Sequence, residues 1–164
     1  MKRSLIILLF LGMAMGLAAN TLFLYSYELL EGETQSFSTS INEGMMEELF
    51  ETPYIAYDNV AQNNSEAFDP AMDLNDFLVM AKTGGAHYFL AVNSVSHENE
   101  LNEGAGELDS EIHYFLYNAK TSELLGAGRL LKRIVFEKKT QMEKAFVEIG
   151  HELVHTVMDF FPGD

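Results

Sequence analysis

Two histidines and a glutamate near the C-terminus have the types and the spacing that could do chemistry. His151, Glu152 and His155 form the pattern His-Glu-x-x-His in a stretch that predicts a helix. In zinc peptidases, two histidines four residues apart on a helix bind the metal and the glutamate is the general base. A small zinc-dependent metallopeptidase that uses His151, Glu152 and His155 is therefore one function the sequence allows.

The rest of the same segment argues against a catalytic zinc. Such a site needs a third protein ligand, and the only acids after His155 are Asp159 and Asp164. The apolar stripe of the helix is centred on Leu153, so a step of 100° per residue puts His151 and His155 on the opposite, polar face. We therefore favour an incidental polar face and assign no catalytic, cofactor or metal residues. A surface metal site from both histidines and Asp159 is an intermediate alternative.

Other side chains that could react or bind metals lack the necessary neighbours. The aspartates lack the spacing and glycine of a calcium loop and fit helix capping. The histidines lie on expected strands as packed or edge residues, and the serines have neither a glycine elbow nor a partner histidine. These side chains are Asp69, Asp73, Asp76, His87, His113, Ser36, Ser38 and Ser40.

The elements that must position these residues follow from hydrophobic periodicity. Alternating apolar residues indicate strands, and apolar residues every three or four positions indicate helices. We expect strands at 21–29, 54–60, 87–96, 111–117 and 123–135, and helices at 35–51, 73–83 and 136–161. The order β-α-β-α-β-β-β-α predicts an α/β sandwich with one mixed sheet and helices packed on it. Residues 20–164 would form a single domain.

Two glycine-containing segments are expected to interrupt the strands. Residues 98–110, the acidic stretch, carry five acids and two glycines, which predicts an exposed, mobile hairpin loop. Gly126 and Gly128 predict a bulge or a close backbone approach in the last strand.

The N-terminus is typical of an export signal. Lys2 and Arg3 precede an apolar run, and Gly16-Leu17-Ala18 fits the small-x-small pattern of a cleavage site. The run is shorter than the roughly 20 residues that span a bilayer. We expect a cleaved signal peptide at 1–19, no membrane span afterwards, and a periplasmic or secreted protein.

Charge excludes one class of partner. The chain has 10 Lys and Arg against 25 Asp and Glu, a net charge of −15. Nucleic-acid binding depends on Lys and Arg, so nucleic acid is not an expected partner. No cysteine is present, which excludes disulfides and a cysteine nucleophile.

Two short segments carry a resemblance to known proteins. Residues 81–90, Ala-Lys-Thr-Gly-Gly-Ala-His-Tyr-Phe-Leu, resemble a helix–Gly-Ala–strand junction, and residues 117–125, Tyr-Asn-Ala-Lys-Thr-Ser-Glu-Leu-Leu, resemble a hairpin. Both are similar to the N-terminal domain of the Tol–Pal translocation protein and its relatives. These include the curli secretion channel protein and periplasmic lipoproteins that activate peptidoglycan synthases. The resemblance implies an α/β fold and a non-enzymatic envelope protein that acts through partners.

The sequence thus favours a non-enzymatic, exported protein that makes protein–protein contacts in the bacterial cell envelope. The expected partner is an unidentified envelope protein, and a homo-oligomer is possible. The alternatives are the zinc metallopeptidase and a small-ligand-binding module.

Overall fold

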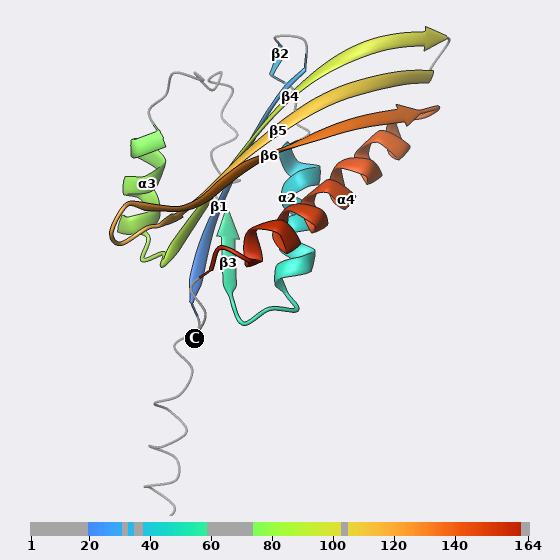
Figure 1. The fold of residues 1–164 in the computed structure, drawn as a ribbon. Coiled ribbons are helices and arrows are strands. Elements are labelled where there is room, and N and C mark those ends of the chain that lie inside the picture. The colour runs from blue at the N-terminus through green and yellow to red at the C-terminus, as the bar shows by residue number, and fades with distance from the viewer. Residues whose placement is uncertain (1–19, 31–32, 35–37, 59–73, 103–104, 162–164) are drawn as a thin grey trace, which may run out of the picture.

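The chain folds as one mixed β-sheet with helices on both faces (Figure 1). The structure is a computed structural model that describes residues 20–30, 33–34, 38–58, 74–102 and 105–161. The expected signal peptide at 1–19 lies outside the described residues.

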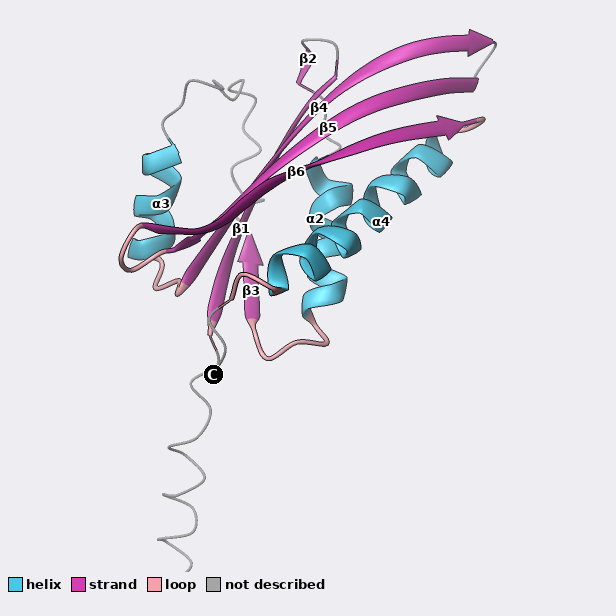
Figure 2. Cartoon of the chain, in the orientation of Figure 1, coloured by secondary structure: helices cyan, strands magenta, loops and turns pink. Residues whose placement is uncertain are grey.

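The order of strands and helices agrees with the prediction, and the α/β fold class is confirmed (Figure 2). A two-residue strand that the sequence did not indicate is added after the first strand. The strands are β1 (Thr21–Leu30), β2 (Glu33–Thr34), β3 (Ile55–Asp58), β4 (Tyr88–Asn102), β5 (Ala105–Asn118) and β6 (Glu123–Phe136). The helices are α2 (Ser38–Leu49), α3 (Leu74–Thr83) and α4 (Lys139–Met158).

The sheet is mixed, and β4 lies where its parallel part meets its antiparallel part. The main strand order is β2-β1-β4-β5-β6, and β3 also pairs with β1. β1 is parallel to β3 and to β4, with Leu24 opposite Leu90. Parallel neighbours need a crossover connection, which α2 and α3 provide. From β4 onward the strands are antiparallel and follow one another directly.

One face of the sheet is covered by α2 and α4, and it holds the larger core. The α4 stripe that the sequence predicted is buried there: Phe146, Leu153 and Val157 have no exposed surface, and Ile149 is 4% exposed. Leu90 of β4 is buried against the same cluster. Burial of this stripe accounts for the orientation of α4.

The other face is covered by α3 at one end only. Phe77, Leu78 and Ala81 of α3 pack against Phe23 and Phe89 of the sheet. In Figure 1 this helix lies beside the end of the sheet where β4 begins. Beyond α3, no described helix covers this face.

The prediction for the acidic stretch is wrong. β4 continues to Asn102 and β5 begins at Ala105, so the described part of this stretch is paired strand. Leu108 is buried, and Glu107 and Asp109 point to the opposite face. The charges misled the prediction because they alternate with inward-facing residues, which is the pattern of a half-buried strand.

The start of the last helix also differs from the prediction. Phe136 is the last residue of β6 and pairs with Gly106. The Gln141 side chain accepts hydrogen bonds from the backbone N–H groups of Glu137 (2.8 Å) and Lys138 (3.2 Å). These bonds satisfy amides at the helix start, so the helix begins at Lys139.

The predicted irregularity in β6 is confirmed. The register between β5 and β6 shifts between Leu116 and Tyr117, opposite Gly126. A Cβ on Gly126 would overlap the Phe160 ring, and one on Gly128 would overlap the Tyr114 side chain.

None of the described helices is long and apolar enough to span a bilayer.

Candidate functional site

α2 and α4 cross at two glycines. A Cβ on Gly44 would lie 2.8 Å from the carbonyl carbon of Val147 and 3.0 Å from Cδ2 of His151. The second glycine, Gly150 of α4, lies against the backbone of α2 at Gly44. Because neither glycine has a side chain, the two helix backbones come into contact. The next turn of each helix is therefore also close to the other helix.

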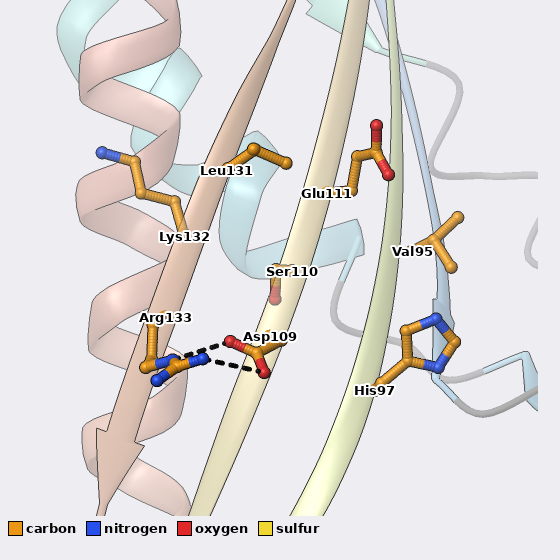
Figure 3. Close-up of a pocket in the computed structure, with 8 residues that line it drawn as sticks. All are labelled: Val95, His97, Asp109, Ser110, Glu111, Leu131, Lys132 and Arg133. Carbon is orange, nitrogen blue, oxygen red and sulfur yellow. Dashed lines mark hydrogen bonds and ion pairs between the residues drawn. The ribbon is translucent and has the colours of Figure 1, made fainter.

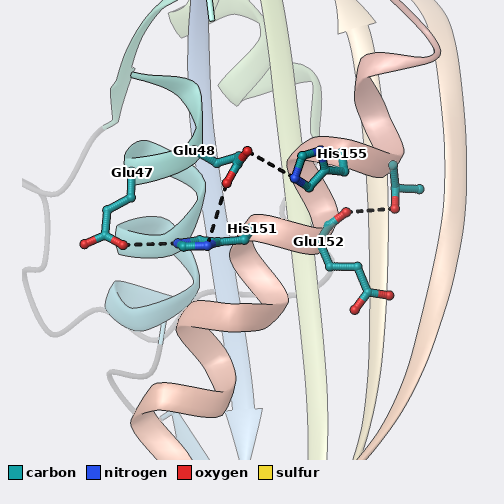
Figure 4. A network of polar contacts seen from close by, with 6 residues as sticks. Glu47, Glu48, His151, Glu152 and His155 are labelled. Carbon is teal, nitrogen blue, oxygen red and sulfur yellow. Dashed lines mark hydrogen bonds and ion pairs between the residues drawn. The ribbon is translucent and has the colours of Figure 1, made fainter. Parts of the chain in front are cut away.

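The histidines of α4 meet carboxylates of α2 beyond this crossing (Figure 4). His151 Nε2 lies 3.1 Å from Glu47 Oε2, and His151 Nδ1 lies 3.7 Å from Glu48 Oε2. His155 Nε2 lies 3.1 Å from the other Glu48 oxygen, Oε1. Glu48 thus contacts both imidazoles.

We call these four residues the His–Glu cluster: Glu47, Glu48, His151 and His155. Their side chains differ in how far they are exposed to solvent. The side chain of His155 is 72% exposed, as predicted for a polar helix face. His151 is 38% exposed and Glu48 is 24% exposed, because the two helices cover them. The histidines therefore line the edge of a helix–helix contact, which the stripe on α4 alone did not predict.

Glu152 does not join the histidines. Its carboxylate pairs with the ammonium group of Lys132 on β6, and in Figure 4 the side chain points away from Glu48. A step of 100° per residue turns Glu152 from the His151 direction toward the sheet. The general base of the peptidase alternative is thus not beside the two histidines.

Glu47 and Glu48 are the residues that sequence reasoning missed. His151 and Glu47 are 104 positions apart, so no local spacing connects them. The only signal was the pair of acids beside the apolar positions of the first helix. Within the described residues, the carboxylates that contact His151 and His155 come from α2 rather than from Asp159. As the described side chains are placed, no group of three or more His, Asp or Glu residues could hold a metal ion.

A second candidate site is the part of the sheet that α3 leaves open. We call it the uncovered sheet face, and in Figure 3 its side chains project from neighbouring strands. It consists of Val95, His97, Asp109, Glu111, Leu131, Arg133 and Val135. Leu131 and Val135 are each 66% exposed, which is high for aliphatic side chains on a strand.

Ion pairs hold the charged side chains on this face. Arg133 Nε donates to Asp109 Oδ1 at 2.8 Å and also lies 3.5 Å from Glu107. The hydrogen bond to Asp109, with the charges of both acids, raises the pKa of Arg133 above its usual value. Glu111 accepts from Arg129 at 3.2 Å. The acids of β5 are thus matched by arginines of β6.

The remaining sequence candidates do not come together. His87 Nδ1 accepts a hydrogen bond from the Thr21 backbone N–H and also lies 2.8 Å from Thr21 Oγ1. His113 contacts Glu111. Ser40 is buried, and Asp76 is exposed in the first turn of α3. Asp69, Asp73, Ser36 and the Ser38 side chain lie outside the described residues.

Comparisons with known proteins identify the fold. No protein-family description matches the sequence, and no curated protein matches it. Lipoprotein GNA1162 from Neisseria meningitidis is similar in structure, with 8% identity, a TM-score of 0.54, and coverage of 85% of this chain and 99% of that chain. Protein XCC0632 from Xanthomonas campestris has 9% identity and a TM-score of 0.52, with 86% and 84% covered.

The PelC dodecamer from Paraburkholderia phytofirmans is also similar, with 10% identity, a TM-score of 0.50 and 89% of each chain covered. At these identities the similarities show the fold alone. They confirm that this chain has the α/β fold implied by its resemblance to the N-terminal domain of the Tol–Pal translocation protein and its relatives.

Proposed function

We propose that this chain is an exported, non-enzymatic protein of the bacterial cell envelope that acts by binding another protein. Its fold is shared with a bacterial lipoprotein and with a protein that forms a dodecamer. Its N-terminal sequence supports export.

The observation that carries the proposal is the uncovered sheet face. Leu131 and Val135 are exposed there, on a sheet whose opposite side packs against α2 and α4. Paired charges surround these aliphatic side chains. An apolar centre with a polar rim, on a rigid element, is the usual composition of a protein-binding surface.

The peptidase alternative gains no support from the geometry. It requires Glu152 next to the metal-binding histidines, but this side chain pairs with Lys132 on the sheet. A water molecule bound near His151 and His155 would therefore lack its general base.

Site-specific photo-crosslinking tests the proposal. A photoreactive amino acid replaces Leu131 in the full chain, expressed in the native host. The matched control carries it at Val79, which is 61% exposed on α3 and outside the proposed surface. We expect a discrete adduct with one envelope protein from position 131 only.

A second substitution checks that the surface itself binds. Val135→Asp, added to the crosslinker variant, should remove the adduct because it puts a charge in the apolar centre. Equal adducts from positions 79 and 131, or an adduct that persists with Val135→Asp, would contradict the proposal.

A further inference from the structure

We propose that Glu48, His151 and His155 bind a divalent transition metal ion, with Zn²⁺ as the best fit, and that this ion joins α2 to α4. The site does not depend on the proposed partner-binding role, because it lies on the opposite side of the sheet from the uncovered sheet face.

The spacing of the donor atoms is the first argument. Bonds of roughly 2.0–2.2 Å from zinc to nitrogen and oxygen place neighbouring tetrahedral ligands roughly 3.4 Å apart. The His155 Nε2–Glu48 Oε1 distance is 3.1 Å and the His151 Nδ1–Glu48 Oε2 distance is 3.7 Å. Both are close to the separation of two ligands on one ion.

Glu47 supplies the second argument, because it orients His151. When His151 donates from Nε2 to Glu47 at 3.1 Å, its Nδ1 lone pair is directed toward Glu48. A lone pair that faces a carboxylate oxygen is repelled unless a proton or a metal cation lies between them. A metal ion at this position would join the two groups while His151 stays neutral. A carboxylate on the far nitrogen of a ligand histidine is the usual outer-shell arrangement of metal sites.

The supporting elements are the third argument. The Gly44–Gly150 crossing holds the ligand-bearing turns of α2 and α4 together, and His151 and His155 are one turn apart. Each imidazole contacts a different oxygen of Glu48, so binding requires side-chain rotation to a common point. His155 is 72% exposed and is free to make that rotation.

The donor set and its surroundings indicate the class of metal and its role. Two imidazoles with a carboxylate suit zinc and its transition-metal neighbours rather than magnesium or calcium. Because His155 is exposed to solvent, a water molecule would occupy the fourth coordination position of the ion. Because Glu152 is paired with Lys132, the ion would stabilise the contact between the helices rather than catalyse hydrolysis.

Calorimetric titration of the metal-stripped full-length protein with zinc chloride tests the site. We expect a single equivalent to bind and the thermal midpoint to rise with zinc concentration, because the ion binds the folded state. Glu48→Gln and His155→Ala should abolish both effects. Glu47→Gln should weaken binding roughly 10-fold or more, as loss of an outer-shell carboxylate does.

Two control variants make the result specific. His113→Ala removes a histidine that also contacts a glutamate at 3.1 Å, but on the sheet, and it should bind zinc like the wild type. Asp159→Asn tests the alternative ligand on α4 and should also bind normally. No zinc binding by the wild type, equal binding by wild type and Glu48→Gln, or loss with Asp159→Asn, would overturn the proposal.

Discussion

Gly150 of α4 rests directly on Gly44 of α2. A Cβ on Gly150 would lie 3.0 Å from the Gly44 Cα and 2.8 Å from the Met45 nitrogen. Backbone atoms cannot yield as a flexible side chain can. This contact sets the distance between the two helices and brings the carboxylates of α2 to His151 and His155.

Gly150→Ala should destabilise the protein by about 1–3 kcal/mol, the usual cost of overpacking. The direction is informative, because glycine to alanine inside a helix ordinarily stabilises by about 0.5–1 kcal/mol. Urea unfolding measures the change, with exposed Lys144→Ala as the control. An unfolding midpoint above that of the wild type would show that the helices do not touch here.

Leu153→Ala should lower the free energy of unfolding by about 2–5 kcal/mol, because it empties a fully buried leucine site. Leu153 has no exposed surface and packs in the core between α4 and the sheet. Glu148→Ala on the exposed side of α4 should change the free energy of unfolding by no more than about 0.5 kcal/mol. Similar values for the two variants in chemical denaturation would place the α4 stripe outside the core.

Ser96 and Ser110 should be energetically coupled. Their hydroxyl oxygens are 2.7 Å apart and buried within the long β4–β5 hairpin. A double-mutant cycle with both alanine variants should give a coupling of about 0.5–1.5 kcal/mol, the value of a typical internal hydrogen bond. Additive effects in equilibrium unfolding would mean that the two strands are not paired at this point.

Tyr57 should make the protein sensitive to alkali. Burial raises the pKa of Tyr57 above 10.0, and its hydroxyl makes no hydrogen bond to the described residues. Above the unfolded pKa, the unfolded chain loses this proton while the folded chain keeps it, so stability falls as pH rises.

Tyr57→Phe removes the ionising group and should reduce the loss of stability between about pH 8 and about pH 10.5. Unfolding curves at both pH values, compared with those of the wild type, measure this change. A variant that loses as much stability as the wild type would exclude Tyr57 as the source.

Export should remove the N-terminal segment. The small-x-small pattern of Gly16-Leu17-Ala18 predicts a mature chain that begins near Ala19 or Asn20. Intact-mass spectrometry of the exported protein tests this, with protein retained in the cytoplasm as the reference. Exported protein that still begins at Met1 would contradict the prediction.

Local pattern was enough to predict the elements and the fold class. The spacing of Phe146, Leu153 and Val157 predicted both the helix and its buried side, because each follows from the geometry of a single helix. Alternating residues predicted the strands in the same way. The prediction of an export signal also rests on consecutive residues alone.

The contacts between distant segments were decided by the tertiary structure. Glu48 reaches His151 and His155 only because glycines let α2 and α4 cross closely. The acidic stretch became strand because Leu108 faces the core while Asp109 pairs with Arg133 of β6. Helix crossing and strand register depend on contacts between residues far apart in the chain, and hydrophobic periodicity within one segment carries no information about them.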